Sequence, residues 1–74
     1  MCNCDNSEKV MELRALIDHM KHHTEHHTEE IVKLAETAGE LGFAESKAAL
    51  EECKALSDKL VESYIKALET MKMR

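Results

Sequence analysis

The sequence predicts an all-α protein, an antiparallel hairpin of two helices that pairs with a second copy into a four-helix bundle. Three observations favour this fold class. The 74 residues include no proline or tryptophan, one tyrosine and one phenylalanine, so strand-forming residues are too sparse and scattered for a sheet. Apolar residues recur at spacings of three and four in two long segments, as in amphipathic helices. The two glycines fall between these segments, where a helix is expected to end.

The first helix is expected from about residue 7 to about residue 40, after a flexible tail at residues 1–6. Asp5 or Ser7 offers the side-chain oxygen of an N-cap. The apolar positions of this helix are Val10, Leu13, Leu16, Ile17, Met20, Ile31, Leu34, Ala35, Ala38 and Leu41. The turn at residues 41–43 suits a Schellman stop, in which Gly42 is left-handed and Phe43 closes the motif.

The second helix is expected from about residue 44 to about residue 72, within a hairpin domain that covers residues 7–74. Its predicted inner face comprises Ala49, Cys53, Leu56, Leu60, Tyr64, Ala67, Leu68 and Met71. Leu50, Val61 and Ile65 widen the apolar arc beyond what one partner helix covers. We therefore expect a homodimer, most simply a two-fold symmetric four-helix bundle.

All five histidines lie between residues 19 and 27, where the tetrad His-His-Thr-Glu occurs twice in tandem. A four-residue step turns an α-helix by about 400°. His19, His23 and His27 therefore form one row along the helix, and His22 and His26 form a second row beside it. Continued through this stretch, the heptad pattern places Thr24 and His27 where apolar residues are expected. Polar groups at such positions are costly unless they have partners.

This row predicts a metal site, because imidazoles one turn apart can share an ion. The expected ligands are His19, His23 and His27, with His26 and Glu30 as groups that complete or orient the site. Zinc, nickel, copper, cobalt and iron all accept imidazole, and the sequence does not choose among them. The alternative is a solvated helix segment that happens to be rich in histidine.

The three cysteines are weaker indicators. Cys2 and Cys4 form a Cys-x-Cys pair on the expected tail and, with His22, are secondary candidates for a metal. A reduced, disordered tail is the simpler reading of that pair. Cys53 is expected to be buried as a small hydrophobe on the second helix.

Several classes of function are disfavoured. The formal charge of −5, from 15 acidic and 10 basic residues, argues against a nucleic-acid partner. The lack of a long apolar run or signal-like N-terminus, and the odd number of cysteines, predict a cytoplasmic protein without a membrane partner. The motifs His-Glu-x-x-His and Glu-x-x-His of zinc hydrolases and di-iron bundles are absent, so an enzyme is not the favoured reading.

The row His19-x3-His23-x3-His27, the apolar Ile31, the later Gly42 and the Ala/Leu-rich second helix resemble an uncharacterised prokaryotic family of helical-hairpin domains. The resemblance covers roughly residues 13–70. The family more often has an aromatic residue and an asparagine where this chain has Met20 and Thr24. The resemblance implies a hairpin whose first helix carries His-x3-His-x3-His, often beside His-rich, metal-handling segments. It implies no established activity.

The leading hypothesis is a small dimeric helical protein that binds a transition metal through first-helix histidines, for handling, storage or sensing. The alternative is a non-catalytic helical interaction module whose histidines respond to pH. An enzyme built around a metal would require an open coordination position beside a pocket.

Overall fold

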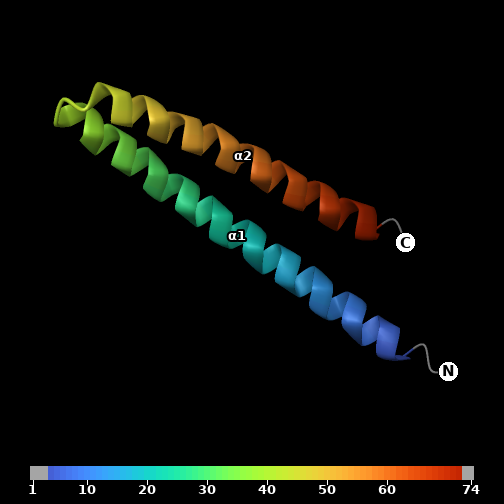
Figure 1. The fold of residues 1–74 in the computed structure, drawn as a ribbon. Coiled ribbons are helices and arrows are strands. Elements are labelled where there is room, and N and C mark those ends of the chain that lie inside the picture. The colour runs from blue at the N-terminus through green and yellow to red at the C-terminus, as the bar shows by residue number, and fades with distance from the viewer. Residues whose placement is uncertain (1–3, 73–74) are drawn as a thin grey trace.

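The chain forms an antiparallel hairpin of two α-helices that pack along each other (Figure 1). The computed structural model describes residues 4–72, with side chains described from residue 8 to residue 71. Helix α1 spans Cys4–Glu40 and helix α2 spans Ala44–Lys72. The molecule is a rod with extents of 62 × 16 × 13 Å, and both described ends lie away from the turn. Helix α1 includes residues 4–6, which the sequence pattern assigned to a tail.

The turn has the hydrogen bonds of a Schellman motif. The Phe43 amide donates to the Ala38 carbonyl at 2.8 Å, and the Gly42 amide donates to the Gly39 carbonyl at 3.1 Å. Gly42 has a φ of 87°, a left-handed conformation that a residue with a Cβ adopts only with strain. The Phe43 carbonyl then accepts from the Lys47 amide at 2.9 Å, which begins α2. The Leu-Gly-Phe sequence therefore forms the stop that it predicts.

The contact between the helices is a narrow stripe on each. Ala35, at 6 % exposure, is the one buried hydrophobic residue among the described side chains. The half-buried residues around it on α1 include Ile17, Lys21, Thr24, Thr28, Ile31, Ala38 and Gly39, and those on α2 include Lys47, Leu50, Ser57, Val61, Tyr64, Ala67, Leu68 and Met71. The three-residue connection holds the helices together near the turn. Small side chains at Ala35 and Gly39 therefore suit the contact there.

The expected inner faces are confirmed in part, because Ala35 and Ala38 of α1 and Tyr64, Ala67, Leu68 and Met71 of α2 lie in the contact. On α2, the predicted inner residues Ala49, Cys53, Leu56 and Leu60 are exposed, with Leu56 at 64 %. On α1, Thr28 rather than His27 faces the partner helix. The prediction that Cys53 is buried is wrong for the single hairpin, in which it is an exposed thiol. His27, which the heptad pattern places at an apolar position, is also exposed in the single hairpin.

A polar contact occupies the middle of the stripe. The Thr28 hydroxyl donates to the Thr24 carbonyl at 2.9 Å, and its oxygen lies 2.5 Å from the Ser57 hydroxyl oxygen. Because Thr28 has used its single proton, Ser57 is the donor of this second bond. The contact satisfies two part-buried hydroxyls across the helix pair.

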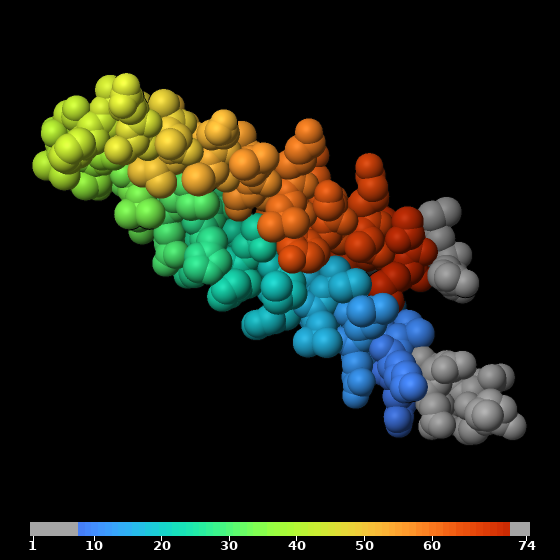
Figure 2. Space-filling model, viewed as in Figure 1, coloured from blue at the N-terminus to red at the C-terminus, as the bar shows by residue number. Residues whose placement is uncertain are grey.

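Large apolar side chains remain on the surface along the whole rod. Figure 2 shows this rod in space-filling form, with α2 lying along α1. Even so, neither described helix contains a stretch apolar enough over sufficient length to cross a bilayer.

Candidate metal centre

The histidine row lies on the surface of α1, near the middle of the helix. His19 and His23 have ring centroids 6.1 Å apart and stack at an interplanar angle of 23°. His23 and His27 have centroids 4.5 Å apart and meet edge to face at 84°. The row expected from the four-residue spacing is therefore a continuous set of three neighbouring rings.

Two of these rings point nitrogens at each other. His23 Nε2 lies 3.0 Å from His27 Nε2. An ion about 2.05 Å from both nitrogens, the usual zinc–imidazole distance, would be bound at an angle of about 94°. Square-planar and octahedral coordination have ligand angles of about 90°, and tetrahedral coordination has angles of about 109°. The angle of the pair lies between these values. The pair is therefore spaced as a chelate without a change of backbone.

A carboxylate orients one ring of the pair. His27 Nδ1 lies 3.1 Å from Glu30 Oε1, so a proton on Nδ1 is donated to Glu30. This tautomer leaves a lone pair on His27 Nε2, the nitrogen that faces His23. The 3.0 Å contact is then a hydrogen bond from His23 Nε2 to that lone pair. An ion held between the two rings would require the other tautomer of His23, with its proton on Nδ1. Two roles were expected for Glu30, that of a metal ligand and that of a group that orients a ligand. Its contact with His27 Nδ1 favours the second role.

The other two histidines are paired with acids of the same helix. His22 lies 3.2 Å from Glu25 through Nδ1 and 3.5 Å from Asp18 through Nε2. His26 Nδ1 lies 4.0 Å from Glu29, beyond hydrogen-bond range. Neither His22 nor His26 is in the described contacts of the row His19, His23 and His27. The structure therefore divides the five histidines into the expected row and two flanking rings.

One chain supplies fewer ligands than a closed metal site needs. Over the described residues, no group of three or more His, Cys, Asp and Glu side chains is arranged to hold an ion. Cys2 and the side chain of Cys4 lie outside the described residues, and Cys53 is an exposed free thiol. The pair His23 and His27 is thus the part of the predicted site that the fold brings to ligand spacing.

Sequence reasoning missed the Thr28–Ser57 contact. Its signal was present: the hydroxyl residues Thr24 and Thr28 lie four apart, and Ser57 lies among leucines and a valine of α2. A hydroxyl within an apolar stripe indicates a partner across the interface.

Fold and surface together define a helical-hairpin domain that carries a row of imidazoles on its first helix. The chain belongs to the family described as Domain of unknown function (DUF8180), whose model matches residues 13–71. The match spans both helices and nearly the same stretch as the resemblance seen in the sequence. No curated protein and no solved structure matches the chain.

Proposed function

We propose that this protein binds a transition-metal ion through the histidines of α1 and serves to handle, store or sense that metal. The observation that carries the proposal is the 3.0 Å separation of His23 Nε2 and His27 Nε2. The carboxylate of Glu30 on the far nitrogen of His27 supports it, because metal-binding imidazoles usually donate their other N–H to such a group. His19 is the next ring in the row, and its ring centroid lies 6.1 Å from that of His23.

The ligand chemistry suits zinc, nickel, copper, cobalt or iron. Imidazole nitrogen binds all of these ions, whereas calcium and magnesium prefer oxygen. The ion is proposed as cargo or signal rather than as the centre of a reaction, because the sequence contains neither His-Glu-x-x-His nor Glu-x-x-His.

We also propose that the hairpin pairs with a second copy as a four-helix bundle. The described chain buries one hydrophobic residue and no large side chain completely. A helical chain of this size usually requires association or another stabilising element to reach ordinary stability. A paired bundle would supply the missing core.

Metal titration of the full chain tests the first proposal. The protein is prepared without a purification tag, and Zn²⁺ binding is measured by calorimetry for wild type and for His23→Ala/His27→Ala. The matched control is His22→Ala/His26→Ala, which removes two histidines from the same helix. We expect wild type and control to bind alike and the row variant to lose binding. Negligible uptake by all three proteins, or equal uptake by the two variants, contradicts the proposal.

A second candidate is a protein-interaction module without a metal. The exposed apolar residues along both helices favour it, because large apolar patches mark binding surfaces. If the protein is such a module, a chelator leaves its melting temperature and its mass in solution unchanged. In that case a change from about pH 8 to about pH 5.5 alters assembly through the histidines.

A further inference from the structure

Most exposed apolar residues of α1 lie on one side of the hairpin, although Met11 and Val32 lie on the other. Residues seven apart return to nearly the same angle on a helix. One such row is Leu13, Met20, His27 and Leu34, and the row beside it contains Leu16 and His23; all six are exposed. His23 and His27 therefore interrupt an apolar surface, which we call the apolar face, rather than a charged one.

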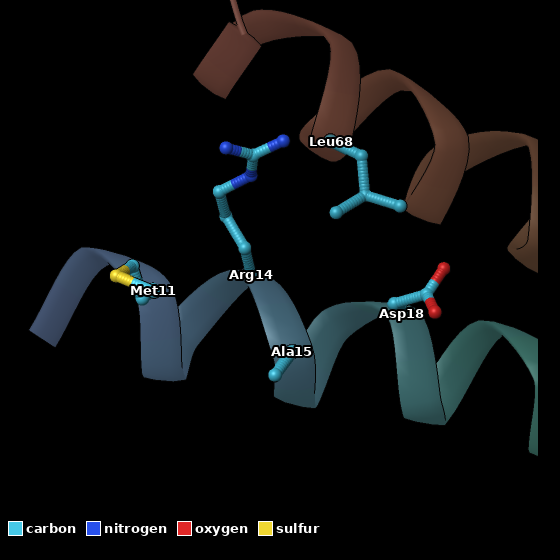
Figure 3. A pocket seen from close by; sticks show the side chains of 5 residues that line it. All are labelled: Met11, Arg14, Ala15, Asp18 and Leu68. Carbon is cyan, nitrogen blue, oxygen red and sulfur yellow. The ribbon is translucent and has the colours of Figure 1, made fainter. Parts of the chain in front are cut away.

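The opposite side is charged. One groove on that side is lined by Val32 and Glu36 of α1 with Lys47, Glu51 and Lys54 of α2. A second is lined by Glu25, Asp58 and Glu62. A third lies between Arg14, Asp18 and Leu68, where Arg14 extends from α1 toward the last turns of α2 (Figure 3). The ion pairs Lys47–Glu51 and Lys54–Asp58 also belong to this side.

Helix α2 contributes to the apolar face as well. Its residues Ala49, Cys53, Leu56 and Leu60 follow a four-and-three spacing on the flank away from Lys47, Lys54 and Asp58. Since those three side chains line the charged grooves, the flank with Leu56 and Leu60 lies on the same side as Leu16 and Met20. The first half of the expected inner face of α2, from Ala49 to Leu60, is therefore the α2 part of the apolar face.

The surface area of the molecule is larger than that of a compact protein of the same mass. The chain exposes 6112 Å², whereas a compact protein of its mass exposes about 4,600 Å². The excess of about 1,500 Å² per chain is the amount that each subunit buries in an obligate homodimer of about 3,000 Å² in total. A second copy of this chain, with an identical apolar face, is the partner that matches both its size and its chemistry.

The histidine pair lies at the centre of the rod. The middle residue of α1 is His22, and the middle residue of α2 is Asp58, next to the Ser57 that bonds Thr28. His23 and His27 lie between these two levels. A two-fold axis through the middle of the apolar face, or one parallel to the helices, places the histidine pairs of the two chains at the same height along the bundle.

We infer that two copies pair through the apolar face and share one transition-metal ion, bound by His23 and His27 of each chain. This inference rests on the proposed metal binding and adds its stoichiometry and the source of the missing ligands. Each chain supplies two nitrogens at ligand spacing, and no described group in one chain supplies a third. Four imidazoles from two chains complete a four-coordinate site. The imidazoles of His23 and His27, which interrupt the apolar face, then have the shared ion as a partner at the interface.

The stoichiometry of the wild-type chain tests the inference. Native mass spectrometry and sedimentation equilibrium are recorded for tag-free protein titrated with Zn²⁺ alone. We expect a mass of two chains and saturation at one ion per two chains. Saturation at one ion per chain, in a monomer or in a dimer, overturns the shared site while leaving the proposed metal binding intact. An absence of histidine-dependent binding removes both.

Two variants test the face. Leu16→Glu/Leu60→Glu places charges on the apolar face at side chains that are 62 % and 46 % exposed in the single chain. Met11→Glu is the matched control, since Met11 is 70 % exposed and lines a groove of the charged side. We expect the first variant to become monomeric and to bind Zn²⁺ at least about tenfold more weakly, and the control to remain a dimer. A dimer of the first variant with unchanged affinity overturns the inference. If that variant unfolds, the number of ions bound per wild-type chain still decides whether two chains share one ion.

Discussion

Replacing Glu30 by glutamine is the sharpest test of how the site is oriented. The Glu30 carboxylate lies 3.1 Å from His27 Nδ1 and fixes the tautomer that aims a lone pair at His23. Loss of such a carboxylate typically weakens metal binding about 10- to 100-fold, or about 1.4 to 2.7 kcal/mol. Both side chains are more than half exposed, at 56 % and 59 %, so we expect the lower value, about tenfold, for each Glu30 in the site. A site shared by two chains contains two such pairs, and the expected loss is then about 100-fold.

The chain contains its own control for this test. His26 and Glu29 have the same spacing on the same helix, but their atoms are 4.0 Å apart and make no hydrogen bond. Glu29→Gln removes the same charge as Glu30→Gln, so the effect of net charge alone is common to both. Zn²⁺ affinity is measured for both variants by competition with a chromophoric chelator. Equal weakening by the two substitutions, or by neither, would refute the argument that Glu30 orients His27.

Three further outcomes are expected. Gly42→Ala lowers the free energy of unfolding by about 1 kcal/mol, because the residue has a positive φ. Gly39→Ala is neutral or stabilising, since its Cβ would meet only the flexible end of Lys47. Urea unfolding measures both variants, and an equal loss of stability would count against the turn geometry. Thr28→Val costs about 1 kcal/mol by leaving the Ser57 hydroxyl unpaired, and adding Ser57→Ala restores most of it; a double variant less stable than the single one speaks against the contact. Lowering the pH from about 7.5 to about 5.5 weakens Zn²⁺ binding by about tenfold or more, because only neutral imidazole has a free lone pair. Zn²⁺ titration at both pH values measures this change, and an affinity independent of pH argues against histidine ligands.

The sequence by itself determined the helices, the turn and the histidine row. Composition and periodicity indicate two amphipathic helices, and Gly42 followed by Phe43 indicates a left-handed stop. These features depend on residues close in the chain, for which helix geometry fixes the spacing. The neighbouring rings of His19, His23 and His27 follow from the same four-residue step.

Only the tertiary structure decided which stripe of each helix faces the other. Several apolar stripes of similar content run along α2, and periodicity fixes the angles within a helix but leaves the rotation of one helix against another open. In the observed packing Ala35 is buried against α2 and Thr28 meets Ser57, while His27 stays on the apolar face. A position that the heptad marks as core is therefore exposed in the single hairpin, because each of two paired helices buries only one stripe against the other.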